Sequence, residues 1–374
     1  MKKVIIISPA YPLRGGIAES TELLYKEYNR QGVRCQIISY KLQYPKIFFP
    51  GKKQTVKDSE KESFNIVSKL NSINPMSWYF TAKYIISEKP DYVIFRFWNP
   101  FFAFCLGFIA LLLRNIKKVG WVDNVFPHKK VPFQNLLILF FFKKMNAFIV
   151  MSESVKNDIQ RFQVKVPILK SIHPIYNNFG KIITQSLARK KINLSLDDKY
   201  ILFFGFIRKY KGLDLLLDSM SDDKIIDRKI KLIVAGEFYE NEKYYRDKIN
   251  NLNLSDSVYV YDYYIENNDV NNYFCAADLV VQPYLSATQS GISMIAFYFN
   301  KPVLATNVGG LSEYIKNGQN GYLVEPNSKD ITNLIVDYFD KNRELEFVNK
   351  IKQIKAQYSW SKLVFSFEKI VDSI

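Results

Sequence analysis

The chain has 374 residues, with 52 Lys or Arg against 36 Asp or Glu, which gives a net charge of +16. This length exceeds what a single hydrophobic core usually serves, so it predicts two domains. Three scattered cysteines and two histidines exclude a disulfide framework and a Cys/His metal centre, and they favour a reducing compartment.

The first half alternates short apolar runs with helical patterns. Its opening apolar run ends at Pro9 and is too short for a signal peptide, so it predicts a first buried strand. The segment from Gln43 to Met76 is polar and weakly patterned; it is interpreted as a loop over a binding cleft or as a surface excursion. Strands are expected at Val4–Ser8, Cys35–Tyr40, Asp91–Phe97, Lys118–Val122, Ala147–Met151 and Ile168–Ile172.

The second half repeats the alternation. Its apolar runs are continuous, as in parallel strands that are buried on both faces. The pattern therefore predicts an α/β protein of two doubly wound, Rossmann-like parallel-sheet domains, residues 1–175 and 176–374, with a cleft between them. The joint is expected in the stretch from His173 to Lys181. Strands are expected at Tyr200–Phe206, Ile230–Ala235, Ser257–Tyr261, Leu279–Pro283 and Pro302–Thr306.

The charge is unevenly distributed. Residues 1–180 hold 27 Lys or Arg and 11 Asp or Glu, whereas residues 181–374 hold 25 of each. All the excess positive charge thus lies in the first half, which favours an anionic partner such as a membrane surface, a polyphosphate or nucleic acid. A lysine-rich solvated surface is the alternative.

Two loops that follow expected strands carry groups suited to phosphate. Gly15 and Gly16 open a helix after the first strand, where bare backbone and a helix N-terminus favour an anion; a tight turn is the alternative. Arg208 and Lys211 follow the first strand of the second half, in a loop expected to face solvent. Two cations at this point can clamp a diphosphate.

The stretch from Tyr284 to Gly310 has one formal charge, Lys301. A buried helix face is expected from Ile292 onward, because apolar residues recur at helical spacing. The preceding turn therefore offers hydroxyls and bare amides at a helix N-terminus, which can bind phosphate oxygens; a Ser-capped helix start is the alternative. The turn consists of Ser286, Thr288, Gln289, Ser290 and Gly291.

Taken together, these stretches resemble the retaining glycosyltransferases of family 4, which have the GT-B fold. The resemblance covers nearly the whole chain and rests on Gly15-Gly16, "FIRKYKG", "VAGEFYE", "ATQSG", "NKPVLATNVGGLSEYIKNGQNGYLV" and "YSWSKLVFSFEKIV". The last piece resembles the family's final helix, about residues 359–374, which crosses back to the first domain. The resemblance implies an acceptor-binding first domain and a donor-binding second domain. The donor contacts that it implies are Gly15, Gly16, Gly236, Glu237, Thr288, Gln289, Ser290 and Gly291.

The chain departs from the family at two places. Many members carry Glu-x7-Glu, but the matching positions here are Ala287 and Ile295, which implies a variant donor site. Many members also have a His near the reacting sugar, where this chain has Asp123 followed by Asn124. Asp123 is expected to accept a hydrogen bond from a sugar hydroxyl. Five residues on, His128 is interpreted as a cleft residue or as a surface loop residue.

The implied reaction moves a sugar from a nucleotide diphosphate to a hydroxyl of a polysaccharide or lipid-linked saccharide, with retention and without a metal or other cofactor. Arg208 and Lys211 would then neutralise the departing charge. Two stretches, residues 98–118 and 132–145, join apolar runs to Lys and Arg. They predict a cytoplasmic protein held peripherally at the anionic inner face of the membrane, with core helices with basic ends as the alternative.

Two other functions fit the same fold. A nucleotide-sugar epimerase would need acidic and His side chains in the cleft, and this chain has few. A catalytically degenerate sugar-nucleotide-binding subunit would explain the absent Glu and His residues. Nucleic-acid binding rests on charge alone and has no recognised module. The donor sugar, the base and the acceptor stay open.

Overall fold

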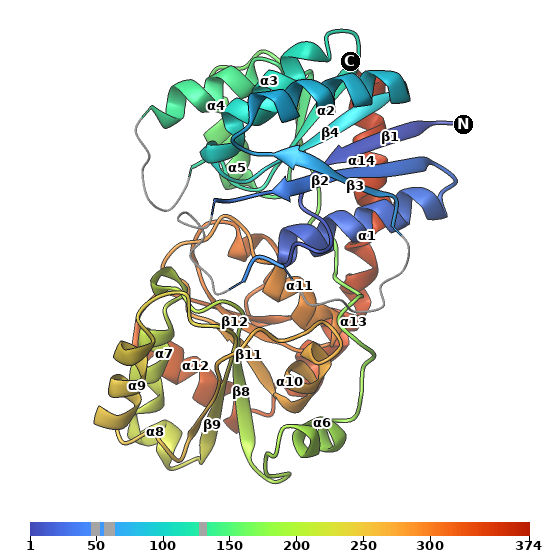
Figure 1. Cartoon of the computed structure of the whole chain (residues 1–374). Helices are drawn as coiled ribbons and strands as arrows, with labels where there is room; N and C mark the ends of the chain where they lie inside the picture. Colours follow the sequence, from blue (N-terminus) through green and yellow to red (C-terminus); the bar gives the residue numbers. More distant parts are fainter. Residues whose placement is uncertain (46–52, 56–63, 127–132) are drawn as a thin grey trace. The chain divides into compact units, whose positions relative to one another are not determined.

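The computed structural model describes residues 1–45, 53–55, 64–126 and 133–374. The chain divides into two compact units. The first comprises Met1–Pro174 together with Ser359–Ile374, and the second comprises Ile175–Tyr358. Each unit is a parallel sheet with helices on both of its faces (Figure 1). His128 lies outside the described residues.

Seven parallel strands form the sheet of the first unit, in the order β3-β2-β1-β4-β5-β6-β7. Its central strands are buried on both faces, which explains why their sequences are continuously apolar. The strands are β1 Lys3–Ile7, β2 Arg34–Leu42, β3 Ile66–Asn71, β4 Tyr92–Phe97, β5 Lys117–Val122, β6 Ala147–Val150 and β7 Ile168–Lys170.

Helices cover both faces of this sheet. On one face α1 packs against α14, so the end of the chain completes the first unit. On the other face α2, α3 and α4 lie side by side (Figure 1). The helices are α1 Gly16–Arg30, α2 Pro75–Glu88, α3 Ala103–Leu112, α4 Gln134–Phe142, α5 Glu153–Gln160 and α14 Trp360–Asp372, with a short 3-10 turn, η2, at Pro100–Phe102.

The second unit has a six-stranded parallel sheet in the order β10-β9-β8-β11-β12-β13. Its strands are β8 Lys199–Phe204, β9 Ile230–Ala235, β10 Val258–Tyr261, β11 Leu279–Gln282, β12 Val303–Thr306 and β13 Gly321–Val324. Its helices are α6 Gln185–Lys191, α7 Leu213–Met220, α8 Asp223–Ile226, α9 Glu242–Asn251, α10 Val270–Ala276, α11 Gly291–Tyr298, α12 Ser328–Asp340 and α13 Glu344–Ile354, with 3-10 turns η3 Lys209–Lys211, η4 Leu311–Glu313 and η5 Lys355–Gln357.

Two strands were missing from the sequence prediction, and both are edge strands. β3 lies inside the segment from Gln43 to Met76, which was interpreted as a loop, and the start of α2 also lies there. β3 exposes Ser68 and Lys69, because an edge strand has one side open to water. β13 has only four residues and begins with a glycine. Neither strand has the long apolar run that identified the central strands.

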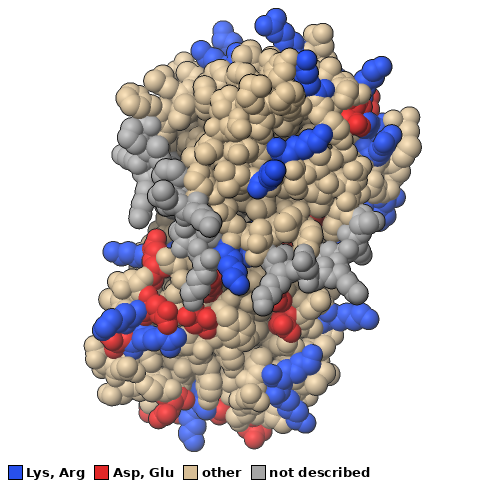
Figure 2. All heavy atoms as spheres, in the orientation of Figure 1, with Lys and Arg blue, Asp and Glu red and all other residues tan. Residues whose placement is uncertain are grey.

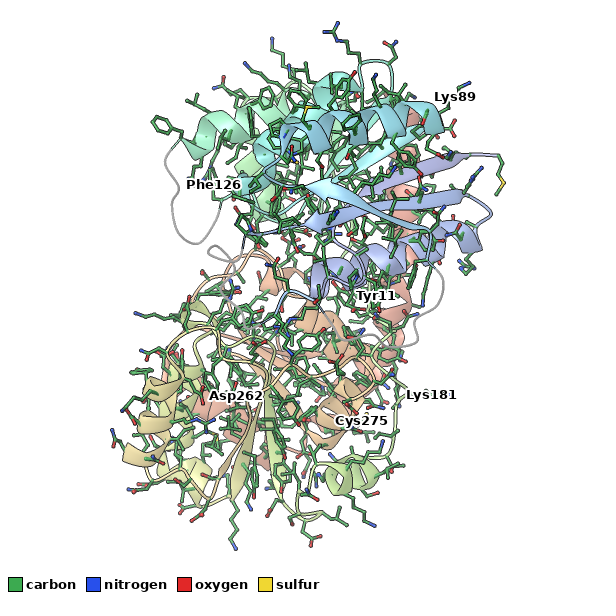
Figure 3. The ribbon with its side chains drawn as sticks, in the orientation of Figure 1. Tyr11, Lys89, Phe126, Lys181, Asp262 and Cys275 are labelled. Carbon is green, nitrogen blue, oxygen red and sulfur yellow. The ribbon has the colours of Figure 1, made fainter. Side chains whose placement is uncertain are left out.

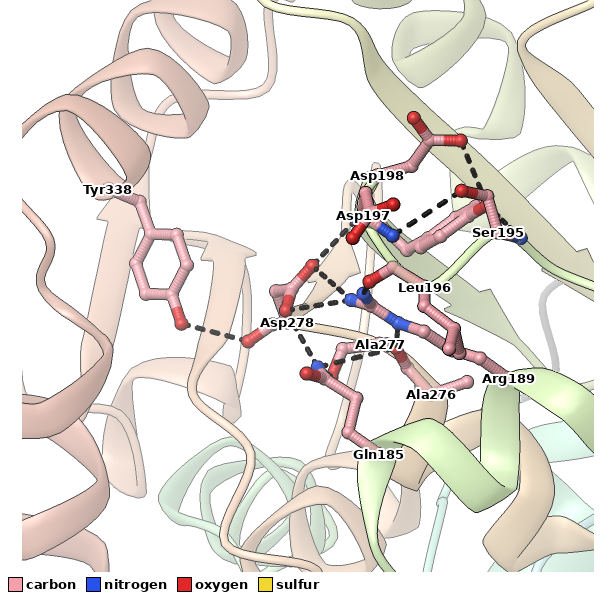
Figure 4. Close-up of polar contacts among 11 residues, drawn as sticks. Gln185, Arg189, Ser195, Leu196, Asp197, Asp198, Ala276, Ala277, Asp278 and Tyr338 are labelled. Carbon is pink, nitrogen blue, oxygen red and sulfur yellow. Dashed lines mark hydrogen bonds and ion pairs between the residues drawn. The ribbon is translucent and has the colours of Figure 1, made fainter.

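A buried ion pair fixes the amino end of the second sheet. Arg189 of α6 donates from Nη2 to both carboxylate oxygens of Asp278, each at 3.1 Å, and from Nη1 to the carbonyl of Leu196 at 2.6 Å (Figure 4). Asp278 also accepts from the backbone N–H of Tyr200 at 2.7 Å. Because β8 and β11 begin here, this network joins α6 to the amino ends of two neighbouring strands.

No helix in the described ranges combines the length and the apolar character that crossing a bilayer requires.

Candidate functional site

The carboxyl ends of β8, β9 and β11 meet in the second unit, and glycines let their loops touch. A Cβ added to Gly236 would lie 2.4 Å from the carbonyl oxygen of Gly205, which joins the loops after β9 and β8. A Cβ added to Gly212 would lie 1.9 Å from the carbonyl oxygen of Pro283, which joins η3 to the loop after β11. Gly212 also has a φ of 67°, so two independent constraints require glycine there.

Lys211 lies at the centre of this junction. A Cβ added to Gly205 would lie 3.1 Å from the Nζ of Lys211. The same added Cβ would lie 3.5 Å from Cδ1 of Ile292, near the start of α11. The sequence predicts that Lys211 and the N-terminus of α11 converge at the carboxyl edge of the sheet, and these distances place them together. The sequence analysis expected this loop to face solvent. That expectation is wrong at Lys211, which is only 8% exposed.

The Lys211 ammonium is buried without a counter-charge. Burial, with a smaller contribution from the positive charge of Arg208, lowers the pKa of Lys211 from 10.5 to about 7. Within the described ranges the ammonium has no hydrogen bond or ion pair, and its Nζ lies 5.7 Å from the ring centroid of Tyr284. A buried cation in such surroundings is costly, so the site is electrostatically prepared for an anion.

Arg208 lies three residues before Lys211 and adds a second cation. It is half-buried, and its Cζ lies 4.9 Å from the ring centroid of Tyr239. In the described part of the chain its guanidinium forms no ion pair. Stacking on an aromatic face restricts the guanidinium while leaving its N–H donors available in the ring plane.

The turn before α11 presents a helix N-terminus that no side chain caps. Ser290 is the N-cap residue, but its hydroxyl accepts a hydrogen bond from Nε2 of Gln282 at 2.8 Å and not from the helix. Gln282 Oε1 in turn accepts from the Ser293 hydroxyl at 2.7 Å. The alternative of a Ser-capped helix is therefore wrong, and the first amides of α11 keep the partial positive charge that binds anions.

Backbone packing also holds the rest of this turn. A Cβ on Gly309, whose φ is 54°, would lie 1.5 Å from the carbonyl oxygen of Ala287. A Cβ on Gly291 would lie 3.2 Å from Cε2 of Tyr176, so the Tyr176 ring leaves little room for a larger side chain at this position. Thr288 and Gln289 are half-buried in the same turn. These contacts fix the backbone close to α11.

Glu237 follows Gly236 at the end of β9 and is 2% exposed. Its carbonyl accepts from the backbone N–H of Ile207 at 2.9 Å, which ties the loop after β9 to the loop after β8. Both donor contacts expected here, Gly236 and Glu237, therefore lie at the same edge of the sheet as Lys211.

The predicted glycine pair of the first unit lies at the start of α1. Gly15 is the N-cap residue, with a φ of 112°, and no side chain caps the helix. Among the described residues, a Cβ on Gly15 or Gly16 would meet no atom within 4 Å, so there is room beside both glycines. The preceding loop is fixed by the backbone N–H of Tyr11, which donates to Glu22 Oε1 at 2.8 Å.

Asp123 follows β5 and pairs with Arg96 of β4. Both residues are buried, and Arg96 donates from Nε to one carboxylate oxygen at 2.5 Å and from Nη2 to the other at 2.7 Å. The sequence prediction treats Asp123 as a group directed at substrate. The structure shows a carboxylate already held in a bidentate ion pair, with Asn124 half-buried beside it.

Trp121 and His173 complete this buried cluster. The Cζ of Arg96 lies 3.2 Å from the ring centroid of Trp121, its neighbour across the β4–β5 pair. His173 is 3% exposed, and burial lowers the pKa of its imidazole to about 4, so it is neutral at pH 7. The charges of Asp123 and Arg96 also act on it. The structure thus surrounds Asp123 with three groups that the sequence interpretation did not connect.

Sequence reasoning missed Arg96 as a partner of Asp123. A signal was available, since "YVIFRFW" places a cation inside a run that predicts a strand buried on both faces. A charge in such a strand needs a counter-ion nearby. Gln282 was missed too, because a polar residue at a strand end has no pattern of its own.

The described residues hold no group of three or more His, Cys, Asp or Glu side chains placed to bind a metal ion.

Comparisons with known proteins point to glycosyltransferases. The chain is 25% identical to an uncharacterized glycosyltransferase of Methanocaldococcus jannaschii over 387 positions, which cover 100% of this chain and 98% of that protein. It is 29% identical to the lipopolysaccharide 1,2-N-acetylglucosaminetransferase of Salmonella typhimurium over 197 positions, 50% of this chain and 51% of that protein. The crystal structure of Anabaena HepE in complex with UDP superposes with a TM-score of 0.74 at 15% identity, covering 100% of both chains.

Two parallel-sheet α/β domains of this kind define the GT-B fold, as the sequence predicts. Residues 184–356, which lie within the second unit, match the family model of the glycosyl transferases group 1. The fold and these matches support glycosyl transfer as the class of activity.

Proposed function

We propose that this protein is a retaining glycosyltransferase of family 4. In this proposal it transfers a hexose from a nucleotide diphosphate sugar to a saccharide hydroxyl without a metal ion. One observation carries the proposal: in the described part of the chain, Lys211 is buried without a counter-charge, and it lies beside Arg208 and the N-terminus of α11, which Ser290 does not cap. A diphosphate supplies the missing negative charge at a point where three positive groups converge.

The proposed reaction exchanges one bond at the anomeric carbon for another. The bond from this carbon to the diphosphate oxygen breaks, and a bond to the acceptor oxygen forms on the same face. The acceptor proton passes to the departing phosphate, so no protein base is needed. Lys211, Arg208 and the amides of α11 stabilise the charge that develops on the leaving group. Each such contact in a dry site contributes about 2–4 kcal/mol to transition-state stabilisation.

The donor site is proposed to differ from that of members with Glu-x7-Glu. The backbone of Ala287 lies against Gly309, and Ile295 is buried on α11, with 5% of its surface exposed. Neither position supplies a carboxylate for the sugar or the ribose. We propose that backbone groups and the turn residues Thr288 and Gln289 contact the donor in their place. The Anabaena structure contains UDP, which makes a uridine nucleotide the first donor to test.

Asp123 is proposed to contact the donor sugar while it is held by Arg96. A carboxylate oxygen can accept more than one hydrogen bond, so pairing with Arg96 does not by itself prevent Asp123 from accepting one from a sugar hydroxyl. Arg96 then acts as a positioning residue, because it fixes the plane of the carboxylate. Gly15 and Gly16 are proposed to admit the donor at the N-terminus of α1, where a Cβ would meet no described atom within 4 Å.

The acceptor is proposed to be a growing polysaccharide or a lipid-linked saccharide at the inner face of the membrane. The name of the Salmonella relative refers to lipopolysaccharide, which is a lipid-linked saccharide. The basic first half of the chain suits a cytoplasmic protein that is bound peripherally to anionic lipid.

The test begins with thermal unfolding in the presence of UDP-, GDP-, dTDP- and ADP-glucose. The best binder is then incubated with saccharide acceptors, and the product anomer is determined by NMR. Retained configuration and activity in EDTA are expected. Inversion at the anomeric carbon or dependence on a metal would contradict the proposal. Binding without turnover would instead indicate a degenerate sugar-nucleotide-binding subunit, and epimerised donor would indicate an epimerase.

A further inference from the structure

Three neighbouring helices of the first unit have an apolar outer surface. α3 and α4 contain no charged residue, and α2 contains only Lys83 and Glu88. A surface helix of a globular protein normally directs charged side chains to water. α1, on the opposite face of the same sheet, follows that rule, with five charged residues among its fifteen.

Large apolar side chains on these three helices are exposed to solvent. The exposed fraction is 60% for Met76 and 59% for Phe80 on α2, 50% for Phe104 on α3, and 66% for Leu136 on α4. Phe133, which immediately precedes α4, is 78% exposed. We call these five residues the α2–α3–α4 surface. Isolated exposed apolar residues are ordinary, but five on adjoining helices indicate an interaction surface.

Aromatic contacts make this surface continuous from one helix to the next. The ring centroid of Trp78 on α2 lies 5.5 Å from that of Phe104 on α3, and Phe104 lies 5.8 Å from Phe140 on α4. A Cβ on Gly107 of α3 would lie 2.6 Å from Cε1 of Phe140, so α3 and α4 pack closely. The helices that carry the exposed side chains therefore form one packed layer, in which α2, α3 and α4 lie side by side (Figure 1).

Cations accompany the apolar side chains. The Nζ of Lys83 lies 4.9 Å from the ring centroid of Tyr79, and the Nζ of Lys144 lies 5.7 Å from that of Phe140. Lys89, at the end of α2, is exposed (Figure 3). In the space-filling view, Lys and Arg side chains stand on an otherwise uncharged surface of this unit, with few acidic side chains among them (Figure 2).

The stretch of sequence that contains these helices is rich in positive charge. Residues 72–146 hold ten Lys or Arg and three Asp or Glu. Glu88 is paired with Lys3, and Asp123 is paired with Arg96. Asp91 accepts a hydrogen bond from the backbone N–H of Lys3 at 2.6 Å. The acidic side chains of this segment are thus engaged with other groups.

We propose that the α2–α3–α4 surface docks flat onto an anionic lipid bilayer. Its Met, Phe and Leu side chains enter the boundary between headgroups and acyl chains. Lys83, Lys89 and Lys143, which is exposed at the end of α4, contact lipid phosphates. Charge decides between this occupant and a second copy of the chain. A two-fold dimer would place two cationic surfaces against each other, whereas a bilayer with anionic headgroups supplies the opposite charge.

The experiment is vesicle co-sedimentation of the full chain, without donor or acceptor, so its result is independent of the proposed enzyme activity. Vesicles contain phosphatidylcholine alone or with 30% phosphatidylglycerol, a composition chosen for the assay. Binding to the anionic vesicles is expected, with no binding to the neutral ones. A triple variant, Met76→Ser/Phe80→Ser/Leu136→Ser, should lose at least about tenfold in partition coefficient. Lys83→Glu should lose at least about fivefold, an effect that disappears at high salt.

Matched controls carry the same kinds of change elsewhere. Phe365→Ser on α14 and Leu345→Ser on α13 remove side chains that are 66% and 71% exposed, and Lys190→Glu reverses an exposed charge on α6. These variants should bind vesicles as the wild type does. Thermal unfolding of every variant separates lost binding from lost fold.

Two results would overturn the proposal. One is equal vesicle binding by the triple variant and the wild type. The other is a wild type that sediments as a dimer, ignores vesicles and becomes monomeric in the triple variant, which would make this surface an interface between copies.

Discussion

Replacing Lys211 by Met tests the electrostatic basis of the proposed site, beginning with the protein alone. The pKa of Lys211 is about 7 in the folded chain and 10.5 when unfolded. The unfolded state therefore binds more protons between pH 7 and 10.5, and the stability of the wild type rises with pH across this window. Below pH 7 the cost of burying the charge is fully present. The pKa difference corresponds to about 5 kcal/mol.

Met fills a similar volume without a charge, so Lys211→Met should raise the free energy of unfolding at pH 7 by about 2–4 kcal/mol. The variant should also lose the rise in stability between pH 7 and 10. Urea unfolding at pH 6.5, 8 and 9.5 measures both effects. A variant that is less stable than the wild type at pH 7, with an unchanged pH profile, would refute the idea of an unpaired buried ammonium.

Ligand binding should reverse the sign of this effect. A bound diphosphate stabilises the ammonium and draws its pKa back toward the ordinary lysine value, so binding takes up protons. For a donor sugar nucleotide, affinity in the wild type should fall about twentyfold from pH 6.5 to 8.5. Lys211→Met should bind about a hundredfold more weakly at pH 6.5 and lose the pH dependence, while Lys211→Arg should bind without it.

Isothermal titration calorimetry in two buffers of different ionisation enthalpy measures this proton uptake. About half a proton per site is expected at pH 7 and nearly one at pH 8.5. If wild-type binding releases no heat that depends on the buffer, and if Lys211→Met binds the same nucleotide equally well, Lys211 does not contact the diphosphate.

Three further changes test other parts of the site. Arg208→Ala should lower turnover by about a hundredfold with little change in unfolding free energy, because its guanidinium is half-buried and has no ion pair in the described structure. If the variant also lost much of its unfolding free energy, Arg208 would have a structural role. Asp123→Ala should cost about 3–5 kcal/mol of stability, because it leaves the Arg96 charge buried and unpaired. The double variant Arg96→Met/Asp123→Leu should recover much of this stability but not the turnover. If turnover also recovered, Asp123 would have no part in the mechanism. Gly212→Ala should lower the free energy of unfolding by at least about 2 kcal/mol and weaken nucleotide binding. The control Gly318→Ala should cost about 1 kcal/mol, because the φ of Gly318 is also positive but its Cβ would meet open space. Equal losses in the two variants would mean that the contact between Gly212 and Pro283 is unimportant.

The sequence predicted the central strands because burial on both faces leaves a continuous apolar run. β4 and β6 have that signature, and both were found within one or two residues of their ends. The two strands that were not predicted lack it. β3 has an exposed side and β13 spans four residues, so neither could be distinguished from a loop by hydrophobicity alone.

The positions of the candidate residues followed from topology, but their environments did not. Arg208 and Lys211 were predicted at a strand end because loops after parallel strands meet at one edge. The burial of Lys211 depends on Gly205, Gly212 and Pro283, which come together only through backbone contacts between loops. A lysine in a loop is usually solvated, so composition gave no sign of its lowered pKa.

The second unit contains two buried cations, and their contrast is informative. At the amino end of the sheet, Arg189 donates to Asp278, to Leu196 and to the carbonyl of Ala276, so every face of its guanidinium is compensated by the protein itself. At the carboxyl end, Lys211 is buried with another cation nearby and no counter-ion among the described residues. The protein supplies a carboxylate to the buried cation at the amino end of this sheet, and in the described structure it supplies none at the carboxyl end. This contrast supports the proposal that an anion from outside the protein pairs with Lys211; in that proposal, the stability that Lys211 costs in the free protein becomes binding energy for the anion.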